Sequence, residues 1–299
     1  MEQSRVVQGL MRLDNIDEER LYGLIVFDLE HGINRFDLAD IYMGGEAERK
    51  LGNVLKSHPE LRERMFIQSK GSIRIGDNGG YYDLSYKHIK EAVDASFARL
   101  GVDCLDSFLL HRPDIFFDAK EVSLAVEELF KENKIKHFGV SNFSKEEIEY
   151  LLDSLNVPIE TNQVQLGIGH TLLLDEALSF NMNDTLGTNK SGGTYFYMKR
   201  RGIALQAWSP YGVGFFEGSI FDASSYPQLD YALSKMAEKY GVSKCAIATS
   251  FVLSLSKDTT LITGSTDPSH IEEALEGERV NLSKEDWYTL YKDSGHRLP

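Results

Sequence analysis

Four side chains that could handle a proton stand at the ends of short apolar segments or just beyond them. Asp37 and Tyr42 lie within NRFDLADIYMGGEAERKLG, Lys70 closes MFIQSK, and His111 closes LDSFLLH. A phenol with a free pKa of about 10 is a poor proton donor near neutral pH, and a buried ammonium beside it lowers that pKa. A carboxylate such as Asp37 can keep the ammonium charged, and a histidine can orient a substrate oxygen. These residue types indicate a site that protonates an oxygen as negative charge builds on it, which carbonyl reduction requires.

The apolar segments are spaced like the strands of an alternating α/β fold. Nearly continuous apolar runs are typical of strands that are covered on both faces, as in a parallel sheet. Eight runs are predicted as strands, at Val6–Leu10, Ile33–Phe36, Met65–Ser69, Leu105–Leu110, Ile135–Val140, Glu160–Gln165, Ile203–Ala207 and Thr260–Thr263. Helical patterns between most of them predict a (β/α)8 TIM barrel, a single domain over residues 1–299, with its site at the carboxyl ends of the strands. A doubly wound open sheet is the alternative, because local periodicity does not reveal closure.

The segments between the predicted strands are predicted to be helices, apart from two loops. Three apolar stripes are each followed by a glycine placed to end a helix, namely Leu21, Ile25 and Leu29 before Gly32; Ile89, Val93, Phe97 and Leu100 before Gly101; and Leu229, Leu233, Met236 and Tyr240 before Gly241. Further helices are predicted to start near Ser144 and near Asp267. Residues Gly71–Asp83 are predicted to be a glycine-rich loop, and Asn181–Met198 a long loop insertion before the seventh strand, either a lid or a disordered segment.

Composition restricts the classes of partner and the compartment. The 299 residues are 42% apolar and carry a formal charge of −14, which argues against nucleic-acid binding because that needs a basic face. No run approaches the roughly 18 apolar residues of a membrane span, and the first residues lack the layout of a signal peptide. Cys104 and Cys245 are predicted to be reduced, buried thiols of a cytoplasmic protein. The expected partner is a small molecule, and no feature predicts an oligomeric state.

Several other catalytic classes lack their motifs. No GxGxxG run follows a strand, and GVGFFEG at Gly212–Gly218 has its third glycine one position late, so a Rossmann fold is not expected. The histidines at 111, 137 and 170 are scattered, and no metal-ligand spacing is present, so no metal site is predicted. A serine hydrolase would need a G-x-S-x-G elbow, which is missing.

The segment containing Asp37 and Tyr42 is followed by six further motifs: SK at Ser69-Lys70, LLHRPD at Leu109–Asp114, GVSNF at Gly139–Phe143, NQVQ at Asn162–Gln165, AWSPYG at Ala207–Gly212 and ITGSTDPSHIEEA at Ile262–Ala274. In content and order these motifs resemble those of the aldo-keto reductase superfamily, in which the first segment is similar to the signature after the second strand. Within that superfamily the chain is most similar to bacterial and fungal-type oxidoreductases with HRPD after strand four. The resemblance extends over nearly the whole chain from Ser4 onward. It implies an NAD(P)H-dependent reductase of aldehydes or ketones.

The resemblance also implies a role for each catalytic residue. Tyr42 would be the general acid, Lys70 would tune its pKa, Asp37 would pair with Lys70, and His111 would orient the carbonyl group. Asp40 lies in the same turn but not at the catalytic aspartate position of the family, and is assigned a structural role. The same resemblance leaves open a second function, because some similar proteins are regulatory subunits that bind a nicotinamide cofactor as a redox sensor and turn over slowly.

The cofactor contacts implied by the resemblance fall into three groups. The nicotinamide carboxamide would be held by Ser141, Asn142 and Gln163; the ring would stack on Trp208, and the pyrophosphate would lie along Ser209, Pro210 and Gly212; the adenosine end would be held by Gly264, Ser265, Thr266, His270 and Glu273. This end coincides with a predicted helix amino terminus, where free N–H groups favour an anion.

The cofactor implied by the family is NADP, with NAD as the alternative. Many relatives pair the 2′-phosphate of NADP with a lysine or arginine, whereas Gly264 and His270 stand at those two positions here. A neutral histidine is a weaker phosphate partner than a guanidinium group. Because histidine gains charge as the pH falls, NADPH binding is expected to weaken as the pH rises.

Overall fold

Eight strands of this chain close into a barrel in the order β1–β12–β9–β8–β7–β6–β3–β2. The computed structural model describes residues 4–76, 79–178 and 192–296, without the side chains of residues 176–178. The barrel strands are β1 (Val6–Gly9), β2 (Arg35–Asp37), β3 (Phe66–Gly71), β6 (Leu105–Leu110), β7 (Ile135–Ser141), β8 (Thr161–Gln165), β9 (Ala204–Trp208) and β12 (Thr260–Thr263). Each overlaps one of the eight predicted runs. The barrel prediction is confirmed, and closure excludes the open sheet.

Helices connect these strands, and many begin where a polar side chain caps free backbone N–H groups. Asp17 accepts a hydrogen bond from the N–H of Arg20, Ser85 from that of His88, and Ser144 forms a capping box with Glu147. The helices described are α1 (Glu18–Glu30), α2 (Glu46–Ser57), α3 (Tyr86–Leu100), α4 (Ala119–Lys131), α5 (Lys145–Leu152), α6 (Leu172–Leu178), α7 (Thr194–Arg201), α8 (Pro227–Tyr240), α9 (Lys244–Leu253), α10 (Pro268–Arg279) and α11 (Lys284–Asp293), with two 3-10 helices, η1 (Tyr42–Gly45) and η2 (Pro59–Arg64).

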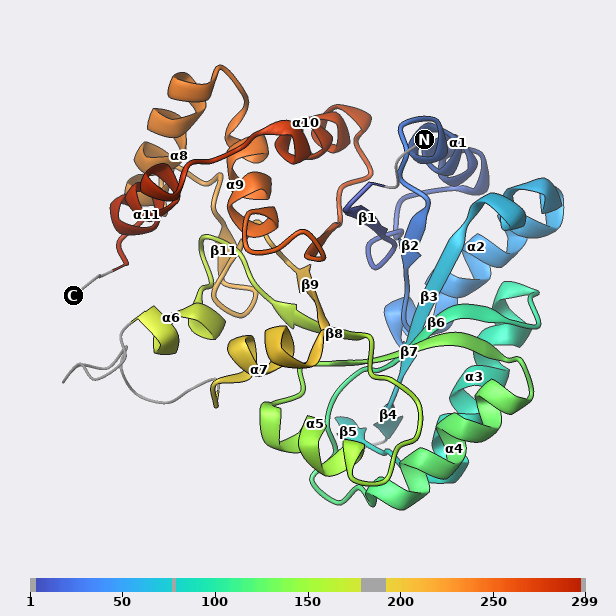
Figure 1. The fold of residues 1–299 in the computed structure, drawn as a ribbon. Coiled ribbons are helices and arrows are strands. Elements are labelled where there is room, and N and C mark those ends of the chain that lie inside the picture. Colours follow the sequence, from blue (N-terminus) through green and yellow to red (C-terminus); the bar gives the residue numbers. More distant parts are fainter. Residues whose placement is uncertain (1–3, 77–78, 179–191, 297–299) are drawn as a thin grey trace. The chain divides into compact units, whose positions relative to one another are not determined.

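The chain divides into two compact units, one of Met1–Gln3 and Val7–Gln163, the other of Ser4–Val6 and Val164–Pro299. The prediction of a single domain over residues 1–299 therefore stays a prediction. In the first unit, Phe36, Phe108 and Phe138 are buried on the strands. Helices α2, α3 and α4 lie side by side along those strands (Figure 1). In the second unit, Phe251 and Tyr291 are buried and both stack on Trp287.

Strand register in the first unit aligns five neighbouring strands, β2, β3, β6, β7 and β8. Parallel pairs join Asp37 to Gln68 and Lys70 to Leu109. Two further pairs join Leu110 to Val140 and Ser141 to Gln163. Because these strands are parallel, the residues that follow them emerge at the same edge of the sheet. This geometry converts positions distant in the sequence into neighbours.

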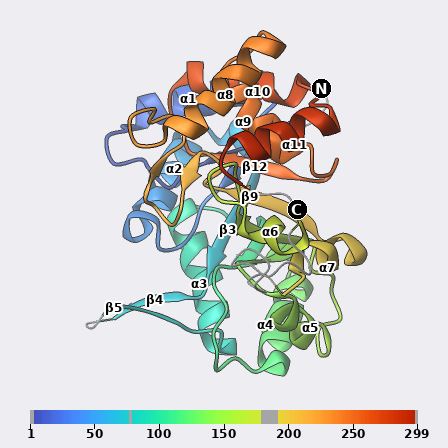
Figure 2. The same cartoon turned by 90° about the vertical axis from the view of Figure 1, so that its left-hand side faces the viewer.

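Two loop predictions need correction. The glycine-rich segment after Lys70 is not a plain loop, because Ile73–Gly76 (β4) and Gly79–Tyr82 (β5) pair as an antiparallel hairpin, which projects outward in Figure 2. In this hairpin, Ile73 pairs with Tyr82 at the open end of the two strands. Within the predicted insertion at 181–198, residues 194–198 belong to α7 and residues 181–191 lie outside the described part.

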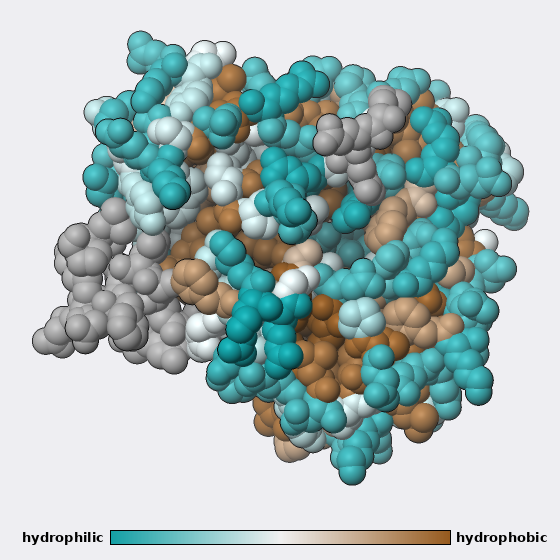
Figure 3. All heavy atoms as spheres, in the orientation of Figure 1, coloured by the Kyte–Doolittle hydropathy of each residue, from teal (hydrophilic) through white to brown (hydrophobic). Residues whose placement is uncertain are grey.

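The surface and the thiols complete the description. Hydrophilic residues dominate the face in Figure 3, with hydrophobic residues gathered in smaller patches between them. Both cysteines are free; Cys245 is buried as predicted, whereas Cys104 is partly exposed. Among the residues that the structure describes, none of the helices combines the length and the apolar character needed to cross a bilayer.

Candidate active site

The turn after β2 carries Tyr42 and has an unusual backbone. The N–H groups of Leu38 and Asp40 continue the pairing with β3 by donating to the carbonyl oxygens of Gln68 and Lys70, at 2.9 and 3.0 Å. The chain then reverses through residues 43–45, whose φ angles are 53°, 66° and 91°, before α2 begins at Glu46. Glycine adopts positive φ without steric cost, which explains two of these three positions. The turn therefore holds Tyr42 against the end of β3.

Lys70 is the centre of the first group of predicted residues. Its side chain is fully buried. The ammonium Nζ donates hydrogen bonds to Asp37 Oδ2 at 2.8 Å, to the carbonyl oxygen of Leu38 at 2.6 Å and to the hydroxyl of Tyr42 at 3.1 Å. All three N–H bonds of the ammonium thus have acceptors, and one acceptor is the phenol. The structure brings the predicted Asp37–Lys70–Tyr42 group together.

Asp37 is held from two sides by amide groups. Its Oδ1 accepts hydrogen bonds from Gln68 Nε2 at 2.7 Å and from Gln163 Nε2 at 2.9 Å, while Oδ2 faces Lys70. Gln68 was not among the predicted site residues. It precedes Lys70 by two positions on β3, and side chains two apart on a strand face the same side, so strand periodicity could have identified it.

Burial and charge act in opposite directions on Lys70 and Tyr42. Burial opposes the charge of Lys70, but Asp37 and the phenol outweigh it and raise the pKa of the ammonium. Burial also raises the pKa of Tyr42, and Lys70 offsets only part of that rise. Lys70 lowers the pKa of the phenol, as expected, but desolvation is the larger effect, so the pKa of Tyr42 lies above its usual value. Tyr42 consequently keeps its proton throughout the neutral range.

His111 completes the predicted catalytic set. Its backbone N–H donates to the carbonyl oxygen of Gly71 at 3.0 Å, which ties the end of β6 to the end of β3. The imidazole ring meets the ring of Tyr42 edge to face, with centroids 5.8 Å apart. Burial, together with the charges of Lys70 and Arg112, holds the pKa of His111 well below its usual value. Its Nδ1 is buried without a hydrogen-bond partner in the described ranges. A neutral imidazole with an unused polar atom is suited to binding an uncharged oxygen.

The residues predicted to hold a carboxamide lie at the ends of β7 and β8. Ser141 Oγ donates to the carbonyl oxygen of Gln163 at 2.9 Å, and Asn142 Nδ2 donates to Ser141 Oγ at 2.8 Å. Asn142 has a φ of 61°, in the left-handed region. Gln163 also donates a hydrogen bond to Asp37. The residues predicted to hold the carboxamide and the residues predicted to be catalytic therefore belong to one hydrogen-bonded network.

In the second unit, Trp208 ends β9 and begins the predicted stacking and pyrophosphate segment. Ser209 has a φ of 49°, and a Cβ at residue 212 would lie 2.7 Å from Ser209 Oγ, so a side chain at residue 212 would force that hydroxyl to move. The ring of Trp208 is flanked by Phe215 and Phe216, with centroids 6.4 and 6.1 Å away. These two phenylalanines were not predicted to be near the site, and no spacing pattern in the sequence identifies them.

The predicted adenosine segment lies after β12 and at the start of α10. Asp267 caps α10 by accepting from the N–H of Ser269 at 2.9 Å, and Ser265 Oγ lies 3.4 Å from Nδ1 of His270. Gly264 and His270 are exposed, and apart from the two residues adjacent to Gly264, no described residue has an atom within 4 Å of the place where a Cβ of Gly264 would be. The open space and the hydroxyl side chains of this segment fit a nucleotide. The Asp267 carboxylate occupies part of the helix end that the sequence suggested for an anion.

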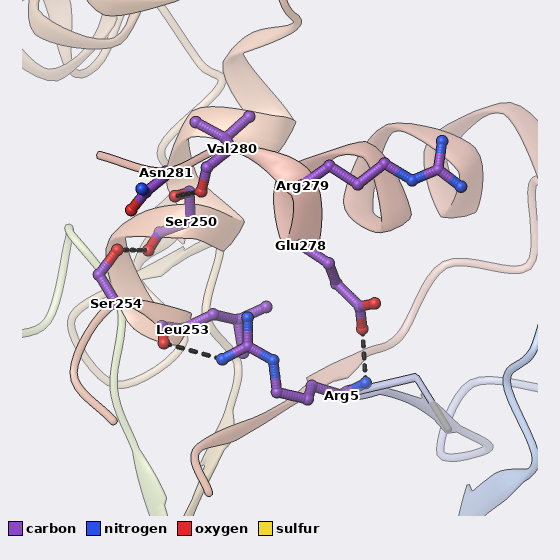
Figure 4. A pocket seen from close by; sticks show the side chains of 8 residues that line it. All are labelled: Arg5, Ser250, Leu253, Ser254, Glu278, Arg279, Val280 and Asn281. Carbon is purple, nitrogen blue, oxygen red and sulfur yellow. Dashed lines mark hydrogen bonds between the residues drawn. The ribbon is translucent and has the colours of Figure 1, made fainter. Parts of the chain in front are cut away.

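One cavity of about 220 Å³ lies elsewhere in the second unit (Figure 4). It is lined by Arg5 and by residues of α9 and the end of α10, including Glu278. Glu278 Oε1 accepts hydrogen bonds from Ser4 Oγ and from the backbone N–H of Val6. Arg5 donates to the carbonyl oxygen of Leu253. These groups bind one another, and none of the predicted site residues lines the cavity. In the described ranges, no cluster of three or more His, Cys, Asp or Glu side chains is arranged to hold a metal.

Comparison with known proteins shows the family and the fold of this chain. A profile of the Aldo/keto reductase family matches residues 5–292. The chain is 30% identical over 301 residues to a 6-dehydroglucose reductase of Agrobacterium fabrum (strain C58 / ATCC 33970), covering 97% of this chain and 94% of that protein. It is 32% identical over 305 residues to Oxidoreductase YdhF of Escherichia coli (strain K12), covering 99% and 95%. The crystal structure of an aldo/keto reductase from Klebsiella pneumoniae in complex with NADP and acetate has the same fold, with a TM-score of 0.73 at 21% identity over 97% of this chain and 91% of that one.

Proposed function

We propose that this chain, which belongs to the aldo/keto reductase family, reduces aldehydes or ketones to alcohols with NADP(H) as cofactor. The observation that carries the proposal is the contact between the Tyr42 hydroxyl and the Lys70 ammonium, 3.1 Å apart and backed by Asp37 at 2.8 Å. A phenol that keeps its proton at neutral pH beside a fixed positive charge is a proton donor suited to a developing alkoxide.

The residues of this chain divide the work on the carbonyl group. When bound, the nicotinamide cofactor supplies the hydride that reduces the carbonyl carbon. Tyr42 donates its proton to the carbonyl oxygen, so that the product is a neutral alcohol. Lys70 stabilises the phenolate that remains on Tyr42, and Asp37 keeps Lys70 charged. His111, neutral because of burial and the nearby cations, donates a hydrogen bond that aims the carbonyl oxygen at Tyr42.

Several observations support a nicotinamide cofactor. Ser141, Asn142 and Gln163 form a polar cluster joined to Asp37, which suits the carboxamide. Trp208 presents an aromatic ring of intermediate exposure for stacking. The structurally similar aldo/keto reductase from Klebsiella pneumoniae was crystallised with NADP, which favours NADP(H) here. NAD(H) is the alternative, because Gly264 and His270 offer no permanent positive charge to a 2′-phosphate.

The substrate class follows from the residues around the strand ends of the first unit. Met11, Tyr81, Tyr82 and Phe116 follow β1, β3 and β6 and are substantially exposed. Phe117, next to Phe116, packs on Phe143 and Tyr150. Exposed aromatic and apolar side chains on the segments that follow these strands favour hydrophobic or aromatic carbonyl compounds.

The test is a screen of aldehydes and ketones with NADPH and NADH on one purified sample, followed at 340 nm. The proposal expects NAD(P)H oxidation that depends on the carbonyl compound and yields the alcohol. Tight binding of NADPH without turnover of any carbonyl compound would refute it and support the regulatory function that the resemblance left open.

A further inference from the structure

Asp40 is a carboxylic acid in the Tyr42 turn to which the proposed reaction gives no role. Its backbone N–H donates to the carbonyl oxygen of Lys70 at 3.0 Å. Its Oδ2 lies 3.2 Å from the place where a Cβ of Gly71 would be, so the carboxyl group lies against β3 immediately after Lys70. Part of Asp40 reaches solvent, but Oδ1 is buried and has no hydrogen-bond partner in the described ranges. Asp40 therefore contacts the turn and the strand that hold the two central catalytic groups.

A second buried carboxylate lies behind Asp40. Glu48 on α2 is fully buried. Its Oε1 accepts from Ser69 Oγ at 2.6 Å, and its Oε2 accepts from Arg99 Nε at 2.6 Å. Ser69 is the residue before Lys70. The backbone at Gly45, where the turn meets α2, also packs on Arg99, because a Cβ there would lie 2.9 Å from Arg99 Cδ. The cluster of Asp40, Glu48 and Arg99 thus joins α2, α3, β3 and the Tyr42 turn.

The charges of this cluster do not balance when both carboxyl groups are ionised. Within the described residues, Arg99 donates to Glu48 through Nε and to Ser96 Oγ through Nη2, and Asp40 Oδ1 has no hydrogen-bond partner. Burial, and to a smaller extent the charge of Glu48, raise the pKa of Asp40, whereas Arg99, the N–H of Ile41 and Lys70 lower it, and the net result is a pKa of about 7. Around neutral pH the cluster can therefore pass from a balanced Glu48–Arg99 pair with a neutral Asp40 to a state with one uncompensated buried charge.

We propose that Asp40 is a positioning residue, and that its neutral acid form, packed against Glu48, Arg99 and β3, holds the Tyr42 turn in the geometry in which the phenol meets Lys70. This inference rests on the proposed reductase function and extends the structural role expected for Asp40. Ionised Asp40 repels Glu48 and places a negative charge behind Lys70. The negative charge of Asp40 favours the ammonium form of Lys70, because each charge stabilises the other. It also offsets part of the positive potential that Lys70 exerts on Tyr42, so the phenolate form of Tyr42 is less stabilised.

The first test is the pH dependence of kcat/KM for carbonyl reduction in Asp40→Asn, Glu48→Gln and a control, Asp94→Asn. The control removes an exposed carboxylate on α3 that pairs with Lys134. A single controlling group with a pKa of about 7 lowers kcat/KM roughly 20-fold between pH 6.5 and 8.5 in the wild type. Asp40→Asn should abolish this decline, and Glu48→Gln should move it to lower pH because Asp40 ionises more easily without Glu48. Asp94→Asn should keep the wild-type profile.

The second test does not need turnover. In protein labelled with ¹³C at tyrosine rings and aspartate carboxyl groups, the Tyr42 resonance should shift with the same midpoint as the Asp40 carboxyl. That shift should be lost in Asp40→Asn and should move to lower pH in Glu48→Gln. The inference is overturned if the Tyr42 resonance and the activity of Asp40→Asn keep the wild-type midpoint. A wild type that reduces no carbonyl compound at any pH refutes the proposed function, while the resonances still decide the role of Asp40.

Discussion

Replacing Asp37 by asparagine should destabilise the protein and should do so most where Lys70 is charged. The carboxylate lies 2.8 Å from Lys70 Nζ, and both side chains are buried. At an effective dielectric constant of 20, two unit charges at this distance attract by about 6 kcal/mol. Removal of one partner from a buried pair costs about 3–5 kcal/mol, because the other charge is left uncompensated. We therefore expect Asp37→Asn to lose about 4 kcal/mol of unfolding free energy at pH 7.

The pH dependence of this loss identifies its cause. In the wild type the folded pKa of Lys70 is raised, so its contribution to stability is complete below the unfolded value of about 10.4 and declines as the pH rises through the folded pKa. In Asp37→Asn, burial of Lys70 without its partner lowers the folded pKa instead, so stability rises with pH until the unfolded lysine also deprotonates. The difference between the two proteins should therefore shrink between pH 7 and pH 9.5.

The assay is urea unfolding followed by circular dichroism at both pH values, with Asp94→Asn as a control for an exposed ion pair. The control should lose less than about 1 kcal/mol. A loss in Asp37→Asn as small as that of the control, or one equal at both pH values, would refute the assignment of a charged, buried Lys70.

Two further predictions concern stability and substrate orientation. Both carboxylate oxygens of Asp28 are buried without a partner in the described ranges, and burial raises its pKa from 3.8 to about 8. A raised folded pKa means that the wild type loses stability as the pH rises, by about 4 kcal/mol between pH 4 and pH 7. Urea unfolding should show that this decline is absent in Asp28→Asn and retained in Glu30→Gln at the exposed end of the same helix; equal declines in all three proteins would contradict the argument. His111→Gln should lower kcat/KM about 100-fold by removing an oriented donor, and steady-state rates within threefold of the wild type would contradict that role.

The sequence allows the barrel strands, and the residues that stand at their ends, to be predicted. Continuous apolar runs identified all eight barrel strands. Because Asp37, Lys70 and His111 each stand at a strand end, the barrel itself brings them to one edge of the sheet. The position of Tyr42 depends in addition on the turn through Gly44 and Gly45, and two consecutive glycines in the sequence indicate such a turn. For these residues, local sequence and global fold agree.

The missed features depend on contacts that no local pattern records. The glycines at 76, 79 and 80 predict a loop, and no local pattern indicates that Ile73 pairs with Tyr82 in the β4–β5 hairpin. The direction of the pKa shift of Tyr42 depends on how much solvent the fold removes, and a list of neighbouring charges does not give that quantity. The Asp40–Glu48–Arg99 cluster joins residues from three parts of the chain, and only the packed structure shows that Asp40 Oδ1 lacks a hydrogen-bond partner among the described residues.

The most direct test of the central claim is the rate of carbonyl reduction in a single turnover of Tyr42→Phe, measured beside NADPH binding by fluorescence. If Tyr42 is the proton donor, the rate constant should fall by about 10²–10⁴-fold, because general acid catalysis is lost. The affinity for NADPH should stay within about threefold of the wild type. A Tyr42→Phe protein that reduces the carbonyl compound at the wild-type rate would contradict the account.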